Sequence, residues 1–114
     1  MAKTKEEVAV QARERRLNIT YGICIGYYDR MLASQGGVCK ICNKPPTTIR
    51  LSVDHRHVNG YKKLDIREKS KEVRGLLCFT CNVLVGKLEK RNNSRQVLTG
   101  IVEYFKIHKL RGDV

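Results

Sequence analysis

The pattern of apolar and polar residues predicts two helices at the start of the chain. Thr4 is followed three residues later by Glu7, which is the spacing of a capping box, and the segment as far as about Leu17 favours helix. A second helix is predicted over residues 27–34, before the glycine pair 36–37, which is typical of a helix end. Its inward-facing residues are expected to be Tyr28, Met31 and Leu32.

The middle of the chain is expected to form two strands joined by a turn. Apolar and polar residues alternate over 47–55, which is the period of a half-buried strand. The sequence VNG at 58–60 is typical of a turn, and VRGLLC at 73–78 is predicted to form the returning strand. The charged segment between them, residues 61–72, is predicted to be a solvated loop or a hairpin extension.

Two further helices are predicted after the second strand. The segment from Cys81 to Arg91 favours helix despite Gly86, and either Asn93 or Ser94 caps the last helix. The order of strand, turn, strand and helix, with helices at both ends, predicts an α+β fold. The last helix carries an apolar stripe formed by Val97, Leu98, Ile101, Val102, Phe105 and Leu110.

Length and charge limit the number of domains and the class of partner. At 114 residues we expect one small domain over 21–92, an N-terminal helical extension over 1–20, and a C-terminal helix over 93–114 that packs on or extends the domain. The formal charge of +12 favours a polyanionic partner, nucleic acid before membrane, although a merely soluble basic protein would also fit the charge alone.

The sequence contains no segment that predicts export or membrane insertion. No stretch reaches the ~18–20 apolar residues that span a bilayer, and the charged N-terminus lacks the apolar region of a signal peptide. We therefore expect a cytoplasmic protein, in which disulfides are rare and paired cysteines indicate a metal.

Four of the five cysteines fall in two CxxC pairs, Cys39-x2-Cys42 and Cys78-x2-Cys81. Four thiolates are the ligand set of a closed tetrahedral zinc site. The alternatives are free thiols and a redox motif, and the second lacks the βαβ surroundings that it needs. Because four sulfurs leave no open position on zinc, this ion would stabilise the fold, and any chemistry would lie elsewhere. Cys24 is expected to be a small buried residue.

The stretch VDHRHVN at 53–59 holds the candidate chemistry. If the chain bends at the strand end, Asp54 and His55 approach Asn82, which follows the last cysteine. The oxygens of Asp54 and Asn82 suit a hard cation such as Mg2+ or Mn2+, and a neutral His55 imidazole can take a proton from an attacking water. The alternatives are a polar loop on a zinc module that only binds nucleic acid, and a second zinc at His55 and His57.

Three ordered segments, YYDRMLASQGGVCKICNKPP, LSVDHRH and VRGLLCFTCN, resemble the recombination endonuclease VII family of HNH (ββα-metal, His-Me finger) nucleases. The resemblance implies a small zinc-stapled ββα-metal core that cleaves DNA with Mg2+ and leaves 5′-phosphate and 3′-hydroxyl ends. It also implies a phage-type protein, which would act in the host cytoplasm, and phage members of the family resolve branched DNA.

The resemblance also assigns roles to the motif residues. The four cysteines of the two pairs would bind the structural zinc, Asp54 and Asn82 would bind the catalytic cation, and His55 would be the general base. His57 would contact the phosphate or support the site.

The departures of the chain from the family pattern include two substituted residues and one longer segment. Arg56 stands where the family has an aspartate, which removes a negative charge beside the site and could add a phosphate contact. Val85 replaces a glutamate of the junction-resolving member, and the 61–72 segment is longer than the usual turn. These differences leave open whether the enzyme nicks duplex DNA or selects a DNA structure.

Basic residues around the motifs are expected to contact DNA phosphates, which position a protein without reading sequence. The candidates are Arg56, Lys62, Lys63, Arg74, Lys87 and Arg91. The first helix could pair with a second copy to form a homodimer, and a monomer that nicks is equally compatible. The alternative function from another class is a non-catalytic zinc module that binds nucleic acid.

Overall fold

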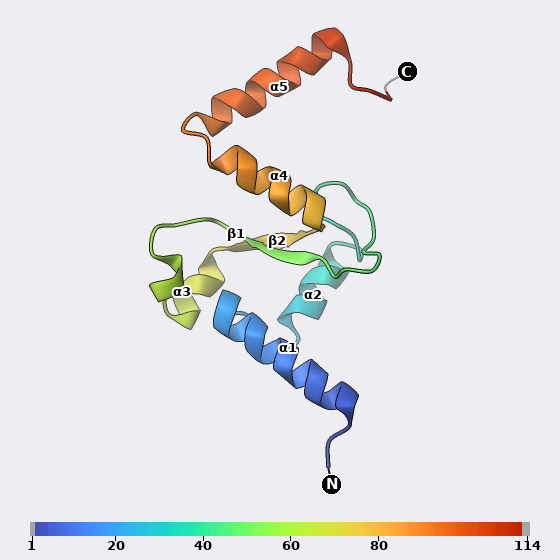
Figure 1. The fold of residues 1–114 in the computed structure, drawn as a ribbon, viewed down its shortest axis with the longest axis vertical. Helices are drawn as coiled ribbons and strands as arrows, with labels where there is room; N and C mark the ends of the chain where they lie inside the picture. The colour runs from blue at the N-terminus through green and yellow to red at the C-terminus, as the bar shows by residue number, and fades with distance from the viewer. Residues whose placement is uncertain (1, 113–114) are drawn as a thin grey trace. The chain divides into compact units, whose positions relative to one another are not determined.

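The structure, a computed structural model, describes residues 2–112 and has the predicted α+β composition (Figure 1). Its elements follow in the order α1 (Lys5–Tyr21), α2 (Tyr27–Ser34), β1 (Ser52–His55), the 3-10 helix η1 (Tyr61–Lys63), α3 (Ile66–Lys71), β2 (Val73–Leu77), α4 (Phe79–Glu89) and α5 (Ser94–His108). The chain divides after Phe79 into two compact units.

Helix α1 begins as the capping box predicts and extends further than expected. The Thr4 hydroxyl accepts a hydrogen bond from the Glu7 N–H at 3.1 Å. The helix continues past Leu17 to Tyr21 and ends at Gly22, whose φ of 71° is left-handed. A Cβ on Gly22 would collide with the carbonyl oxygen of Ile66, so glycine is what allows α1 to approach α3 this closely.

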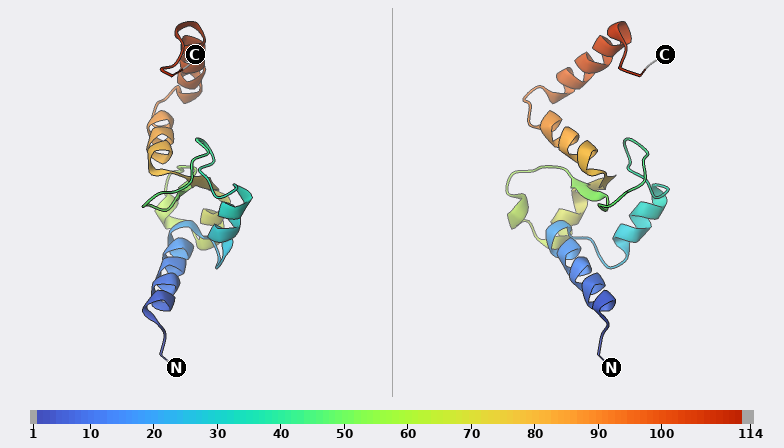
Figure 2. Two further views of the ribbon diagram at one scale, coloured as in Figure 1. Left: turned by 90° about the vertical axis from the view of Figure 1, so that its right-hand side faces the viewer. Right: turned by 45° about the vertical axis from the view of Figure 1, so that its right-hand side comes forward.

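The 61–72 segment is helical, which corrects the prediction of a loop or hairpin extension. It contains η1 and α3, and the Asp65 carboxylate caps α3 by accepting the Glu68 N–H at 2.8 Å. A helix of six residues is too short to be stable alone, so packing against α1 must support it. Figure 2 shows α3 beside the C-terminal end of α1.

Strands β1 and β2 form an antiparallel pair with a shift in register beside the candidate chemistry. Val53 pairs with Leu76 and Asp54 with Gly75, and the register shifts between Asp54 and His55. The second strand lies where it was predicted. The first begins only at Ser52, later than predicted, and Ile49, which the prediction included, is 66% exposed and lies outside the pairing of β1 with β2. A register shift of this kind bends the strand and re-aims the side chains that follow it.

Helix α2 has the predicted bounds and packs beside β2. Tyr28 is buried, and its hydroxyl donates to the Leu51 carbonyl at 2.6 Å. Just past the helix end, the Gln35 amide donates to the Leu76 carbonyl and accepts its N–H, so one side chain continues the hydrogen bonding of the sheet. The buried apolar residues of this unit include Ile23, Tyr28, Leu51, Val53, Leu76 and Leu77.

Two other predictions about apolar residues differ from the structure. Cys24 is exposed, which corrects its prediction as a buried residue, because it lies in the turn between α1 and α2. The apolar stripe of α5 is largely open, with Leu98 50% exposed and Val102 48% exposed, and Leu110, which was predicted to belong to it, lies beyond the helix end at His108. Among the described residues, no helix is long and apolar enough to cross a membrane.

Candidate functional site

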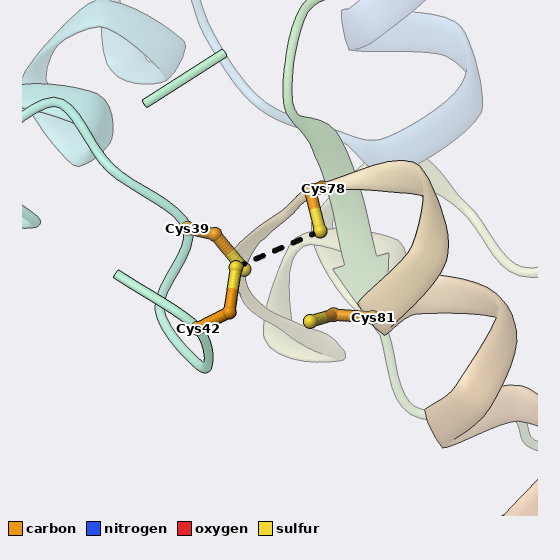
Figure 3. A group of neighbouring side chains, drawn as sticks. All are labelled: Cys39, Cys42, Cys78 and Cys81. Atoms are coloured by element: carbon orange, nitrogen blue, oxygen red, sulfur yellow. Dashed lines mark hydrogen bonds between the residues drawn. The ribbon is translucent and has the colours of Figure 1, made fainter. Parts of the chain in front are cut away.

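The four cysteines of the two CxxC pairs converge on one point (Figure 3). Their sulfur atoms all lie within 4.8 Å of one another, and the Cys42 and Cys78 sulfurs are 3.9 Å apart. Tetrahedral zinc with Zn–S bonds of about 2.3 Å places sulfurs about 3.8 Å apart. The donor set and its spacing therefore fit a structural zinc ion.

Local backbone geometry positions the sulfurs. The Cys39 N–H donates to the Lys44 carbonyl and the Asn43 N–H to the Cys39 carbonyl, which closes a tight turn with Asn43 at a φ of 60°. The Lys40 N–H donates to the Leu76 carbonyl and ties this turn to β2. Cys78 follows β2 directly, so one strand end supports both halves of the cluster.

The surroundings of Cys39 favour the thiolate form that zinc binds. Burial acts to raise the pKa of this thiol, but hydrogen bonds from the backbone around Cys42, Cys78 and Ile41 and from the Cys42 thiol lower it to about 6. A thiol with this pKa is mostly ionised at neutral pH, as a metal ligand must be.

Asp54 is buried and forms an ion pair across the hairpin. The Arg74 guanidinium donates from Nε to Oδ2 at 2.8 Å and from Nη2 to Oδ1 at 3.1 Å, and Nη2 also reaches the His55 carbonyl at 3.3 Å. Two parallel hydrogen bonds to a carboxylate are both strong and directional. Arg74, which the sequence placed among the DNA contacts, thus also holds the candidate metal ligand in place.

We expect Arg74→Met to destabilise the protein by about 2 kcal/mol, because it leaves a buried carboxylate without its charged partner. Urea unfolding of the zinc-loaded protein measures this loss. Arg67→Met is the matched control, since Arg67 is an exposed arginine of α3. Equal unfolding midpoints for the two variants would contradict the stabilising role of the pair.

His55 lies against aromatic rings at the end of β1. Its imidazole stacks on the Tyr61 ring at a centroid distance of 4.1 Å and an angle of 12°, and the His57 ring meets it edge-on at 5.0 Å. Its Nδ1 lies 3.3 Å from the Arg56 carbonyl oxygen. In the tautomer with the proton on Nδ1, that atom donates to the carbonyl, and Nε2 keeps the lone pair that a base needs.

A hollow of about 690 Å3 opens beside His55 and His57. Three lysines of the 61–72 segment line it, Lys62, Lys63 and Lys69. Cationic side chains beside an imidazole are suited to hold a phosphate next to a proton acceptor. The sequence predicted contacts for Lys62 and Lys63, but it did not indicate that they would line the same hollow as the two histidines.

Arg56 forms an ion pair with Glu72. The Arg56 N–H donates to the Glu72 carbonyl at 2.8 Å, and its guanidinium Nε donates to the carboxylate at 2.9 Å. The hydrogen bond that the guanidinium donates to the Glu72 carboxylate, together with the charge of that carboxylate, raises the pKa of Arg56. Arg56 therefore connects the chain leaving β1 to the chain entering β2.

Asn82 lies in the first turn of α4, directly after Cys81. Lys87 and Arg91 follow it in the same unit and are exposed. It stays a prediction that Asn82 approaches Asp54 and binds a cation. The DNA contacts of Lys87 and Arg91 stay predictions as well. Sequence reasoning missed Tyr61 and Glu72, and it missed the pairing of Arg74 with Asp54, because these contacts join segments that are distant in the sequence.

Comparison with known proteins identifies relatives of the chain. The family described as recombination endonuclease VII matches residues 14–107. The Gene 59 proteins of Mycobacterium phages L5 and D29 are each 41% identical to the chain over 70 residues, which are 60% of this chain and 36% of theirs. The chain thus aligns with little more than a third of these curated relatives. No solved structure matches the chain at a significant level.

Proposed function

Because the chain belongs to the recombination endonuclease VII family, we propose that it is a DNA endonuclease that hydrolyses phosphodiester bonds with Mg2+ or Mn2+. The observation that carries this proposal is the His55 imidazole, held between aromatic rings beside a hollow lined by lysines. A module that only bound DNA would need the lysines but not the oriented imidazole.

In the proposed reaction His55 is the general base. Its Nε2 takes a proton from the water that attacks the phosphorus, while Nδ1–H donates to the Arg56 carbonyl and fixes the tautomer. Lys62, Lys63 and Lys69 hold the phosphate and neutralise part of its charge. The bond from the phosphorus to the 3′ oxygen breaks, and that oxygen takes a proton from solvent water, which gives 5′-phosphate and 3′-hydroxyl ends.

Asp54 and Asn82 are the proposed ligands of the divalent cation. Each Asp54 oxygen accepts one N–H from Arg74, and a carboxylate offers about four lone-pair sites, so the group retains capacity for a cation. When bound, the cation would stabilise charge on the phosphate and the departing oxygen. The cysteine cluster would hold zinc as a structural ion and take no part in the reaction.

The family and the phage relatives support a proposal about the biological setting of this activity. We propose that the chain has the HNH (His-Me finger) type of nuclease site, acts in DNA recombination in the cytoplasm of a phage host, and can pair through α1 with a second copy. Two copies would place two active sites on one DNA, which suits cleavage of both strands.

Cleavage of supercoiled plasmid by the zinc-loaded protein tests the proposal. We expect nicked product with Mg2+ or Mn2+, none in the presence of EDTA, and ends that DNA ligase can rejoin. Branched and linear duplexes of one sequence, assayed in parallel, show whether the enzyme selects DNA structure. A protein that shifts DNA in a gel but cuts none of these substrates with either cation would instead be the non-catalytic binding module.

A further inference from the structure

We propose that Tyr61 is a positioning residue for His55, and that it connects the base to the C-terminal end of α1. This inference rests on the proposed function, since it assigns to the 61–72 segment a role in that reaction. Tyr61 touches neither substrate nor cation in this role. It acts by fixing the plane of the imidazole.

The contact between the two rings is close and nearly parallel. Their centroids are 4.1 Å apart and their planes differ by 12°, so a face of the imidazole rests on the phenol ring. The hydrogen bond of Nδ1 to the Arg56 carbonyl is long, at 3.3 Å, and leaves the ring able to tilt about that bond. Stacking on Tyr61 restricts this tilt, and the His57 ring at 5.0 Å and the tilted Tyr21 ring at 5.7 Å limit it further.

Tyr61 is itself anchored to α1. Its hydroxyl donates to the Thr20 carbonyl at 2.7 Å, and Lys69 donates to the neighbouring Ile19 carbonyl at 3.0 Å. The Lys69 ammonium also lies over the Tyr61 ring, 5.7 Å from its centroid. The last carbonyls of a helix have no partner within it, so these two side chains cap α1 while the helix end fixes them.

The sequence context shows why this support is needed. His55 follows the register shift of β1 and is half-buried, so the sheet alone does not hold its side chain. A general base acts only within about 0.5 Å and 10–20° of its productive position. The segment that is longer than the usual family turn therefore supplies the surface against which the base is oriented.

The test uses two substitutions at Tyr61 and one matched control. Tyr61→Phe keeps the ring and removes the hydroxyl, whereas Tyr61→Leu removes the ring. Tyr27→Leu is the control, because Tyr27 is an exposed tyrosine of α2 outside the hollow. We expect Tyr61→Leu to lower kcat by about 10- to 100-fold with little change in KM, as misplacement of a reacting group does. We expect Tyr61→Phe, which keeps the stacked ring but loses the hydrogen bond to the Thr20 carbonyl, to lose clearly less of kcat than Tyr61→Leu, and we expect Tyr27→Leu to match wild type.

A spectroscopic measurement tests the positioning of His55 by Tyr61 without relying on DNA cleavage. The proton resonances of the His55 ring should be shifted upfield in wild type by the stacked phenol, and also in Tyr61→Phe, but not in Tyr61→Leu. The reference is the resonance of a histidine in the unfolded chain, because His57 and His108 each contact another ring in the folded protein. The wild-type spectrum tests the stacking even if the leucine variant does not fold.

The outcomes separate the two proposals. A wild-type protein that cuts no DNA would overturn the proposed function, whatever the spectrum shows. A wild-type protein that cuts DNA but lacks the upfield shift would overturn the role of Tyr61 alone. The role of Tyr61 would also be overturned if a folded Tyr61→Leu variant kept the wild-type kcat, or if Tyr61→Phe lost as much kcat as Tyr61→Leu.

Discussion

Replacing His55 by alanine is expected to slow DNA cleavage by about 10²- to 10⁴-fold, which is the range that general-base catalysis contributes. DNA affinity should change little, because the phosphate contacts proposed for Lys62, Lys63 and Lys69 remain. The fold should also survive, since His55 is only half-buried and lies outside the buried core. Single-turnover cleavage of plasmid and DNA binding in EDTA measure the two properties separately.

Two further histidine variants make this result specific. His108→Ala in α5 is the matched control and should cut DNA as wild type does, because His108 is exposed and far from the motif in sequence. His57→Ala should have an intermediate effect, since its ring only flanks His55. If His55→Ala cut within about threefold of wild type while His57→Ala lost the larger factor, His57 would be the base and the assignment would be wrong.

The sequence predicted those parts of the fold that depend on neighbouring residues. The cap at Thr4, the bounds of α2 and the strand from Val73 follow from short-range signals, namely capping spacing, glycine stops and alternation. The cysteine cluster also followed, because CxxC spacing sets the geometry of each half locally. The fold class was therefore readable from pattern alone.

The missed features depend on contacts between distant segments. The 61–72 segment looked like a loop because it is highly charged, and its helices are supported by α1, with Lys69 bonded to a carbonyl 50 positions earlier. The partners of Arg74 and Arg56 depend on the strand register and its shift after Asp54. The motif located the candidate base, but only the folded chain showed what orients it.

Removing zinc is expected to unfold the hairpin core, and not only to stop the proposed cleavage of DNA. Structural zinc contributes about 10–16 kcal/mol in small zinc domains, which is as much as the whole stability of a typical domain. The core here is thin, and Cys39 and Leu76 are its fully buried side chains among the described residues. Cys39→Ser should therefore abolish zinc binding and the cooperative thermal transition, as should a strong zinc chelator.

Cys24→Ser is the matched control for this substitution, because Cys24 is exposed and outside the cluster. It should bind one zinc per chain and melt as wild type does.

Acid should destabilise the protein, as chelation of zinc does. The pKa of Cys39 is lowered to about 6 before any metal binds, and zinc favours the thiolate further, so its contribution to stability is complete above the ordinary thiol pKa of about 8.5 and is lost only as pH falls below 6.

The zinc and the catalytic cation can then be told apart by what their removal changes. Brief exposure to EDTA should stop cleavage with the circular dichroism spectrum intact, and added Mg2+ should restore activity. Chelation of zinc should abolish both activity and folded structure, and Mg2+ alone should restore neither. A protein that lost zinc, kept its thermal transition and still cut DNA would show that the four cysteines do not hold the fold together.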